Sequence, residues 1–594
     1  MTTRWDYVIV GAGSAGCVLA ARLSEDPACK VLLLEAGPED KSLWLKVPAG
    51  MSRVVWGDRY SWAFRSAPEP HLNNRVLGHP RGKVIGGSSS INGMVWLRGH
   101  PRDFDDWAEL GAQGWSYADV LPYFCRSETA PIQESPLRGH EGPVRVTRGD
   151  VKASPLARAF IEAAGEAGYP QTPDFNGVQQ EGFGAIERST WRGRRWSAAR
   201  AYLHPARQRP NLAVLSGAHS LRLELTGQSV TGVCYAKDRQ SHVALAQEVI
   251  LCAGAIGSPQ LLQLSGVGSP EHLQAAGIKT RHALPGVGEN LNDHPDLVIQ
   301  HACKRPVSLY PATRAPRSWL AGAEWLLKGT GPAASNHFEA GGFIASHPAL
   351  AQPDLQFTFM PLAVVPGGTD ILARHAFQVH IDLMRPRSRG YVRVLSADPR
   401  QAPQILFNYL ADPQDLADLR AGVRLLREVL AQPALSNLAG EELFPGVGIQ
   451  TDAAINAWIR ENLETCYHPV GTCRMGAAHD QDAVVDPACR VRGLEGLRVV
   501  DASIMPRIVS ANTNAATIMI AEKAADLIRG RPPLCATEML NAIALYREAL
   551  TPTGMRMGRL RRPCAKSKSY TDIPLNDVSQ KPGLSVLERS NQWP

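Results

Sequence analysis

The sequence lacks several features, and each absence excludes a class of protein. None of its eleven cysteines stands in CxxC spacing, which excludes the usual zinc-ribbon and thioredoxin-type motifs. Only 20% of the residues are charged and 44% are hydrophobic, a balance that excludes disordered, collagen-like and coiled-coil chains. The uncharged stretch 249–270 is long enough to span a bilayer, but Gly, Ser, Gln and Pro interrupt it. We therefore expect a strand, a turn and a buried helix there.

Positive charge is concentrated near the C-terminus. The formal net charge is +7, and residues 531–594 hold ten Lys and Arg against five Asp and Glu, so the rest of the chain is nearly neutral. A nearly neutral body argues against nucleic acid as a partner. We expect residues 532–594 to form a flexible basic tail, whose run 556–562 either is solvated or contacts an anionic membrane surface.

The N-terminus and the cysteines predict a location. No apolar leader with a cleavage site precedes the strand-like run 7–10, and an odd number of cysteines in a long chain is typical of reduced thiols. We therefore expect a cytoplasmic protein. Peripheral contact with the inner face of the membrane, through the basic tail, is the alternative.

The N-terminal residues form a nucleotide-binding pattern. A β-rich run, 6–10, leads directly into Gly11, Gly13 and Gly16, then into a small-residue helix and a second apolar run that ends in Glu35. In this strand–turn–helix–strand order the glycines allow a tight turn and close approach to a pyrophosphate, and the acid accepts ribose hydroxyls. The pattern predicts a dinucleotide site, the alternative being a glycine-rich turn that only packs a helix. It does not separate FAD from NAD.

Other segments extend this sheet. Runs 248–254 and 497–501 resemble further strands, Ser258 and Pro259 suit the N-cap and first position of a helix, and 517–528 has helical character. Between about residues 300 and 460, strand-like runs alternate with Pro-rich connections. This indicates a separate mixed α/β region inserted between the sheet-forming segments.

Four further blocks carry a family resemblance. They are RGKVIGGSSSINGM at 81–94, GAIGSPQLLQLSGVG at 254–268, YHPVGTCRMG at 467–476, and VDASIMP at 500–506 together with Asn512, Thr513 and Asn514. In this order they resemble the signature blocks of the glucose–methanol–choline (GMC) flavin oxidoreductases, and the resemblance covers residues 6–530. Within that family the chain is most similar to the choline dehydrogenase and aliphatic alcohol dehydrogenase branch.

The resemblance implies a fold and a domain order. The expected fold class is α/β, with a Rossmann-like FAD-binding domain built from discontinuous segments and a mixed α/β substrate domain that contains an antiparallel sheet. The FAD-binding domain is expected at 1–155, 196–300 and 461–531. The substrate domain is expected at 156–195 and 301–460.

The resemblance also implies the cofactor and its contacts. The ADP half of FAD would be held by Gly11, Gly13, Ser14, Gly16 and Glu35; the pyrophosphate and flavin by Val84, Gly87, Asn92, Gly93 and Met94; the ribityl region by Asp501 and Ala502; and the flavin ring by Thr513. Some members of the family attach FAD covalently through a His in the Gly-Gly-Ser block. The matching residue here is Ile91, so we expect non-covalent FAD.

The same comparison implies a catalytic pair. His468 would accept the hydroxyl proton of a primary alcohol, since a His titrates near neutrality. Asn512 would hydrogen-bond the developing alkoxide, and the hydride would pass to flavin N5 to give an aldehyde. Asn514 is the rival for the second position, where an N-cap or turn role is the alternative.

The implied reaction leaves alternatives open. The expected partners are a small-molecule alcohol and a quinone-type electron acceptor. A choline-specific enzyme is the nearest alternative, because the His and Asn act on the alcohol group and not on the rest of the substrate. Hydroxynitrile lyase-type chemistry and a non-catalytic flavin protein are more remote.

Three further residues are candidates for binding. Glu339 lies in the inserted region and either faces a cationic substrate or is a structural carboxylate. Cys466 and Cys473 flank His468 but lack ligand spacing with other Cys or His residues. We therefore expect no metal site.

Overall fold

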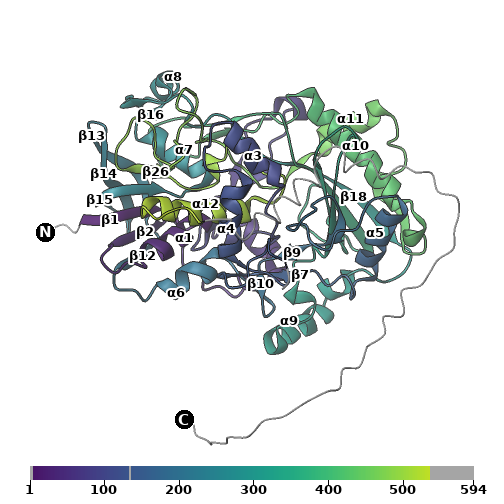
Figure 1. Ribbon diagram of the computed structural model, residues 1–594. Helices are drawn as coiled ribbons and strands as arrows, with labels where there is room; N and C mark the ends of the chain where they lie inside the picture. The colour runs from purple at the N-terminus through teal and green to yellow at the C-terminus, as the bar shows by residue number, and fades with distance from the viewer. Residues whose placement is uncertain (1–3, 133–134, 535–594) are drawn as a thin grey trace, which may run out of the picture. The chain divides into compact units, whose positions relative to one another are not determined.

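The computed structural model describes residues 4–132 and 135–534. All of them lie within one compact unit of the chain. The expected tail therefore falls, from residue 535 onward, outside the described residues, and its basic run 556–562 with it. Figure 1 shows the elements in chain order.

A seven-stranded sheet forms around the N-terminal strand. Its order is β12 (Leu212–Ser216), β2 (Val31–Glu35), β1 (Arg4–Val10), β15 (Gln240–Leu251), β14 (Ser229–Lys237) and β13 (His219–Thr226), and β26 (Leu497–Val499) also pairs with β15. Strands β12, β2, β1 and β15 pair in parallel, and β26 pairs in parallel with β15. Strand β14 pairs antiparallel with β15, and β13 pairs antiparallel with β14. Segments almost 500 residues apart in the sequence thus share one sheet.

Helices cover this sheet and bring its loops to one edge. Helix α1 (Ser14–Leu23) packs on β1 and β2, and also against α12 (Thr513–Ile528), which contacts α4 (Tyr117–Ser127). Figure 1 shows α1 and α12 beside β1. The loops after β1, β15 and β26 all follow carboxyl ends of parallel strands, where open α/β sheets bind their ligands.

One predicted helix start is wrong. Helix α7 (Gly254–Leu264) begins at Gly254 and not at Ser258. The reason is a distant cap, because the Asp501 carboxylate accepts the Gly254 N–H at 2.9 Å and the Ser258 hydroxyl at 2.5 Å. Pro259 consequently lies inside the helix, and the Ala255 carbonyl that it leaves without its N–H accepts the Thr472 hydroxyl at 2.6 Å. Helix α12 likewise starts earlier than the predicted 517.

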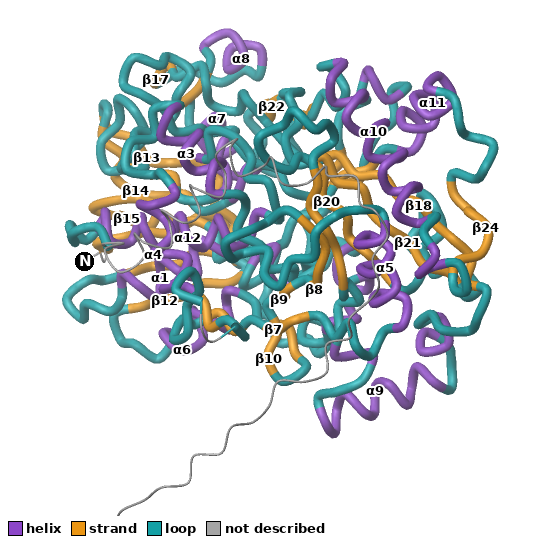
Figure 2. The backbone as a smooth tube through the Cα atoms, turned by 45° about the vertical axis from the view of Figure 1, so that its right-hand side comes forward, coloured by secondary structure: helices purple, strands orange, loops and turns teal. Residues whose placement is uncertain are grey.

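A second seven-stranded sheet is antiparallel throughout. Its order is β24 (Ala439–Phe444), β18 (Pro295–Cys303), β21 (Ala376–Leu383), β20 (Leu355–Met360), β19 (Ala340–Ile344) and β8 (Gly182–Ala185), with β25 (Glu464–Thr465) also on β18. Helices α5 (Pro155–Glu166) and α10 (Pro413–Leu430) pack on this sheet, and α11 (Asp452–Asn462) packs on α10. Figure 2 shows these helices beside β18, β20 and β21.

Together the two sheets give the predicted α/β class. The predicted domain boundaries stay a prediction: β8 lies in 156–195, whereas β18 runs across the expected boundary at 300. The remaining helices are α2 (Ser52–Val55), α3 (Pro101–Glu109), α6 (His204–Ala206), α8 (Pro270–Ala275) and α9 (Arg317–Lys328). Short pairs are β3 (Phe64–Arg65) with β4 (Gly78–His79), β5 (Glu128–Thr129) with β6 (Val144–Arg145), β7 (Thr147–Arg148) with β9 (Glu187–Arg188), β10 (Thr190–Trp191) with β11 (Arg194–Arg195), β16 (Val267–Gly268) with β17 (His282–Ala283), and β22 (Tyr391–Arg393) with β23 (Gln404–Leu406).

Candidate active site

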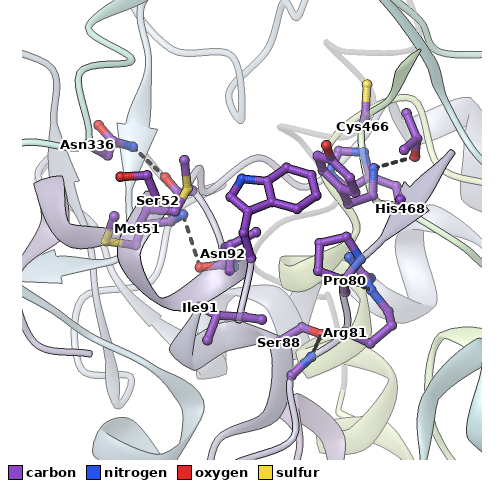
Figure 3. A pocket seen from close by; sticks show the side chains of 18 of the residues that line it. Met51, Ser52, Pro80, Arg81, Ser88, Ile91, Asn92, Asn336, Cys466 and His468 are labelled. Atoms are coloured by element: carbon purple, nitrogen blue, oxygen red, sulfur yellow. Dashed lines mark hydrogen bonds between the residues drawn. The ribbon is translucent and has the colours of Figure 1, made fainter. Parts of the chain in front are cut away.

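A single cavity of about 1980 Å³ is lined by loops of the first sheet and by one face of the second. This is well above the roughly 300–1,000 Å³ of an ordinary small-molecule pocket. Figure 3 shows Asn92 and Asn336 on one side of the pocket and His468 and Cys466 on the other. The volume suits a large cofactor together with a small substrate.

Glycines shape the end of the cavity below β1. Gly11 has a φ of +101°, and a Cβ there would lie 2.5 Å from the Cys252 carbonyl oxygen. Gly87 has a φ of +54°, and its Cβ would lie 2.6 Å from the Cα of Gly13. A side chain at Gly87 would therefore push its turn away from the Gly13 turn, and one at Gly11 would strike the backbone of Cys252 after β15.

Two helix starts point their N–H groups into this end. Neither α1 nor α12 has a side-chain cap within the described ranges, although Ser14, Thr513 and Asn514 all line the cavity. The Ser14 hydroxyl donates to Asn514 Oδ1 at 2.7 Å and ties the two starts together. Uncapped N–H groups and two helix dipoles favour an anion such as a pyrophosphate.

Glu35 closes the same end from β2. Its carboxylate accepts the backbone N–H of Ala12 at 2.9 Å and of Gly37 at 2.8 Å. Burial raises the pKa of Glu35 to about 7, and these two hydrogen bonds only partly oppose that shift. The acid therefore fixes the glycine turn and still lines the cavity, where a ribose would reach it.

The predicted cofactor residues divide into two groups. Eleven of them line the cavity: Gly11, Gly13, Ser14, Glu35, Gly87, Asn92, Gly93, Met94, Asp501, Ala502 and Thr513. The other two lie in the core. A Cβ on Gly16 would lie 1.9 Å from the Gly11 carbonyl oxygen, so this glycine packs α1 on its own turn. Val84 is buried in a small apolar cluster with Leu45, Val54 and Ile91.

The predicted catalytic residues meet beside the start of α12, where Asn512 is the N-cap residue. The Asn512 amide nitrogen lies 3.1 Å from His468 Nε2, and His468 Nδ1 lies 3.0 Å from His294 Nδ1. If Asn512 donates to Nε2, the proton of His468 sits on Nδ1 and Nε2 keeps a lone pair. Asn514 is instead engaged with Ser14, so Asn512 is the asparagine that contacts His468.

Burial keeps this imidazole neutral. Desolvation lowers the pKa of His468 well below the ordinary histidine value, and His294 and Arg81 add to the shift. Burial likewise lowers the pKa of His294 to about 3. Both rings are therefore neutral at neutral pH, and Nε2 of His468 is available to accept a proton.

A buried carboxylate positions the loop that carries His468. Asp293 Oδ1 accepts the His468 backbone N–H at 2.6 Å, and Oδ2 accepts the Tyr409 hydroxyl at 2.5 Å and the Thr465 hydroxyl. Burial raises the pKa of Asp293 to about 6, despite these donors. Asp293 and His294 were not predicted from the sequence, although the polar run 292–294 just before β18 is a signal for them.

One face of the antiparallel sheet forms the wall beside the pair. In register, Asp296 on β18 lies opposite Asp382 on β21 and Glu464 on β25. The even-numbered residues of β18, β20 and β21 that line the cavity are Asp296, Val298, Gln300, Thr358, Met360, Gln378, His380 and Asp382. The odd-numbered neighbours, such as Ile299, Phe357 and Ile381, are in the core. This period-two alternation makes a mostly polar wall over an apolar core.

The acids of this wall are coupled to one another. Asp296 Oδ2 lies 2.8 Å from His380 Nδ1, and the Cys466 thiol donates to Asp382 Oδ1 at 3.0 Å. Burial and the neighbouring Asp296 raise the pKa of Asp382 well above its ordinary value. Burial alone would lower the pKa of His380, but Asp296 outweighs it and brings that pKa to about 9. The wall therefore holds acidic groups that are partly neutralised by protons.

Glu339 has a structural role. Its carboxylate accepts the Asp150 N–H at 2.7 Å, contacts the Ser335 hydroxyl, and pairs with Arg188 at 3.2 Å. Although burial opposes the shift, Arg188 and these donors lower the pKa of Glu339. The reading of Glu339 as a residue facing a cation is therefore wrong, because all its acceptor positions face the protein.

The fold also brings a thiol to two carboxylates. Asp296, Asp382 and Cys466 lie close enough to hold a metal ion. The spacing of these residues along the sequence does not predict the cluster, because Asp296 lies on β18, Asp382 on β21 and Cys466 directly after β25. The Asp382–Cys466 hydrogen bond shows that protons already satisfy part of it, and the absence of a metal stays a prediction.

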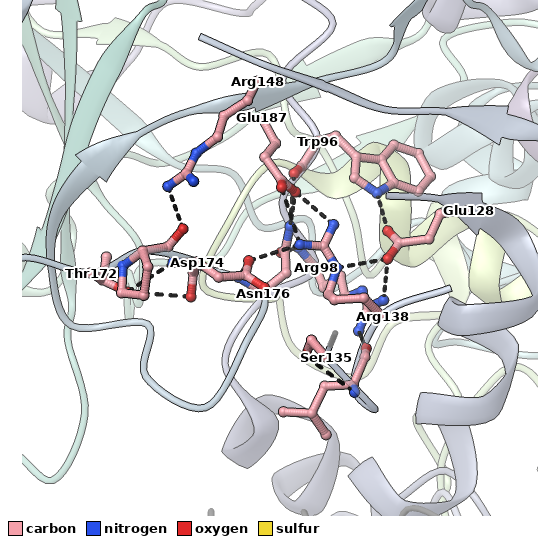
Figure 4. Close-up of polar contacts among 12 residues, drawn as sticks. Trp96, Arg98, Glu128, Ser135, Arg138, Arg148, Thr172, Asp174, Asn176 and Glu187 are labelled. Atoms are coloured by element: carbon pink, nitrogen blue, oxygen red, sulfur yellow. Dashed lines mark hydrogen bonds and ion pairs between the residues drawn. The ribbon is translucent and has the colours of Figure 1, made fainter. Parts of the chain in front are cut away.

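A buried ion network supports the segment that follows Met94 (Figure 4). Glu128 accepts from Arg98 at 2.5 Å, from Arg138 at 2.7 Å and from the Trp96 indole at 2.6 Å. Arg138 also pairs with Glu187 at 2.6 Å. Burial alone would raise the pKa of Glu128, but Arg138 and Arg98 bring it to about 2. The network fixes the side chains of Trp96 and Arg98, which follow the cavity-lining residues 92–94 in the chain.

The geometry therefore brings a cradle suited to a dinucleotide and a contact between His468 and Asn512 into one cavity, and comparison places the chain in a family. The family profile GMC oxidoreductase matches residues 5–296 with its N-terminal part and 386–521 with its C-terminal part. The chain belongs to the GMC oxidoreductase family, as the sequence blocks indicated.

Named relatives and solved structures agree with this assignment. The chain is 50% identical to "Oxygen-dependent choline dehydrogenase" of Proteus mirabilis over 90% of this chain and 97% of that protein, and 51% identical to the Serratia proteamaculans protein of the same name over 89% and 96%. Pyridoxine 4-oxidase from Mesorbium loti superposes with a TM-score of 0.82 at 32% identity, covering 89% of this chain and all of that one. Formate oxidase from Aspergillus oryzae superposes with a TM-score of 0.82 at 26% identity, covering 91% of this chain and 99% of that one.

These findings confirm the enzyme class, the fold class and FAD as the cofactor. The cradle of glycines and the two uncapped helix starts fit that cofactor, since they leave space and N–H donors for its pyrophosphate. Within the described residues, no helix has the length and apolarity required to cross a bilayer.

Proposed function

We propose that the protein oxidises choline, a primary alcohol on a quaternary ammonium group, to the aldehyde. The observation that carries the proposal is the acidic wall, where Asp296 and Asp382 lie in register within the cavity that holds His468. The relatives that are half identical over most of their length bear the name choline dehydrogenase. Both observations favour a cationic alcohol over a general neutral one.

The His–Asn pair would handle the alcohol group. Neutral His468 accepts the hydroxyl proton at Nε2, while His294 holds the other ring nitrogen and Asp293 holds the backbone. The Asn512 amide, now 3.1 Å from Nε2, would donate to the substrate oxygen as it gains alkoxide character. FAD, when bound, supplies the hydride acceptor.

The wall and aromatic rings would hold the cationic end. Asp382 is hydrogen-bonded to Cys466, two residues before His468, and Asp296 lies two residues after His294. Both carboxylates are thus attached close to the reacting pair. Tyr467 and Trp56, whose rings are 6.0 Å apart, also line the cavity. Carboxylates and aromatic faces are the groups that recognise a quaternary ammonium.

Steady-state kinetics with a matched pair of substrates test this proposal. Choline and its uncharged isostere 3,3-dimethyl-1-butanol have the same shape and differ in charge. We expect choline to have at least about tenfold higher kcat/KM, a difference of about 1.4 kcal/mol. Measured toward alkaline pH, where more of Asp382 is ionised, Asp382→Asn should remove most of that preference, mainly through the KM of choline, and leave the isostere unchanged. Equal kcat/KM for the two alcohols in the unaltered protein would contradict the proposal.

The electron acceptor is a separate question. The relatives are named oxygen-dependent, whereas the sequence comparison favoured a quinone-type acceptor. We propose the quinone, tested by reoxidation of the reduced enzyme with oxygen and with a soluble ubiquinone analogue. Faster reoxidation by oxygen would contradict the proposal.

A further inference from the structure

Helix α9 carries an apolar stripe on its outward face. Its exposed residues include Trp319, Leu320, Leu326 and Leu327, with exposed fractions of 73%, 66%, 58% and 85%. With Ala323 they recur at i, i+1, i+4, i+7 and i+8, the spacing of one helix face. A surface helix normally turns such a face toward the core, so its exposure requires an explanation.

The inward side of α9 is anchored to the protein. Trp325 is buried, and its indole N–H donates to the Gly193 carbonyl in the β10–β11 hairpin at 2.5 Å. Ser318, Ala321, Gly322 and Trp325 line the large cavity, and Leu326, at the border of the stripe, reaches it as well. In both Figure 1 and Figure 2, α9 lies at the lower edge of the fold, away from the two sheets. The helix is therefore fixed by one side and presents the other to its surroundings.

Cations lie at the two ends of α9 and beside its inward side. Arg317 and Lys328 stand exposed at the two ends of α9, and Arg314 precedes it. On the adjoining hairpin Arg192 and Arg194 are exposed, the latter stacked 5.6 Å from the Trp325 ring. The helix itself contains one acid, Glu324. An apolar stripe, with Lys and Arg at the helix ends and on the other faces, is the pattern of helices that lie in the interface of an anionic bilayer.

We propose that α9 docks the protein on an anionic lipid bilayer, with its apolar stripe in the interfacial layer. The stripe is too small to be a stable contact between two copies. A 12-residue helix is about 18 Å long and about 10 Å wide, or roughly 200 Å², whereas a stable dimer buries about 800 Å² on each partner. At 12 residues the helix is also too short to span the membrane.

Docking would set the cavity beside the membrane. Because the inward side of α9 lines the cavity, its lipid-facing side is one helix diameter from the cavity wall. A lipid-soluble electron acceptor would then reach the enzyme directly from the bilayer. This consequence rests on the proposed acceptor, but the docking itself does not.

Vesicle flotation of the full-length, FAD-loaded protein tests the docking. One probe is a vesicle of about 40% phosphatidylglycerol and about 60% phosphatidylcholine. The other is a vesicle of phosphatidylcholine alone. The variant is Leu320→Gln with Leu327→Gln. The matched control is Val447→Gln, at a residue that is 73% exposed outside α9. Choline turnover with a soluble dye, measured on the same samples, reports separately on the proposed function.

The expected result is flotation with the anionic vesicles that weakens in high salt. The double variant should partition at least about tenfold more weakly, with Val447→Gln and dye-linked turnover unchanged. The proposal is overturned if the double variant floats as well as the unaltered protein, which is the result expected when the C-terminal tail alone binds lipid. It is also overturned if the unaltered protein does not float. It is also overturned if sedimentation without vesicles shows a dimer that the double variant disrupts.

Discussion

The contact between His468 and Asn512 predicts a specific result in a double-mutant cycle. The two side chains lie 3.1 Å apart and share one face of the cavity, so one substrate oxygen would contact both. The changes are His468→Ala, Asn512→Ala and the pair together. Each single change removes one of the two side chains that would contact the substrate oxygen. Because both side chains are neutral, neither change leaves a buried charge without its partner.

The expected sizes follow from the two roles. Loss of a positioned general base costs about 10²–10⁴ in rate, and loss of one donor to a developing oxyanion costs about 10²–10³. If the two act on one oxygen, the losses do not multiply. The double variant should then be within about tenfold of His468→Ala, since groups that act as a unit are strongly non-additive.

Anaerobic stopped-flow reduction of the bound flavin by choline is the assay, because it reports the chemical step alone. Bound flavin content must be equal in all four proteins. A double variant slower than His468→Ala by the full factor seen for Asn512→Ala alone would show that the two residues act independently. That result would refute the shared-oxygen arrangement.

Four further predictions follow from other parts of the structure. Because burial and Asp296 raise the pKa of Asp382 well above its ordinary value, more of this carboxyl ionises as pH rises, and the KM of choline should fall with rising pH while that of the uncharged isostere stays constant; parallel profiles would contradict this. Arg138→Met should cost about 3–5 kcal/mol in denaturant unfolding, since it removes the buried cation that pairs with both Glu128 and Glu187, whereas Arg400→Met, in an exposed pair, should leave the midpoint unchanged. Gly87→Ala should lower the ratio of flavin to protein absorbance, because its Cβ would strike the Gly13 turn. Acid denaturation should release all the flavin into the filtrate, because Ile91 offers no atom for a covalent link; flavin retained on the protein would refute this.

The fold and the cofactor end of the site could be predicted because they depend on local chemistry. Gly11, Gly13 and Glu35 lie within one strand–turn–helix–strand unit, where each residue type is required by backbone geometry. The start of α7 could not be predicted in the same way. Its cap is Asp501, which lies almost 250 residues away in the sequence, and a local rule assigned that role to Ser258 instead.

The substrate end depended on register, which the sequence did not reveal. Asp296, Asp382 and Cys466 meet only because β18 pairs with β21 in one particular alignment. A local signal did exist in 378–382, where polar and apolar residues alternate. It predicts a strand with one polar face, but it does not say that this face lines the cavity of His468. The sequence left Glu339 between two roles for the same reason, since its pairing with Arg188 depends on the fold.

The central claim is that bound FAD is reduced by an alcohol with a cationic end. The most direct measurement is anaerobic bleaching of the purified yellow protein by choline, with 3,3-dimethyl-1-butanol, a medium-chain alkanol and benzyl alcohol beside it. The account predicts rapid bleaching by choline and slow bleaching by the neutral alcohols. Bleaching by the neutral alcohols with choline inert would contradict the cationic substrate, and a bound flavin that no alcohol bleaches would contradict the redox role and favour a lyase.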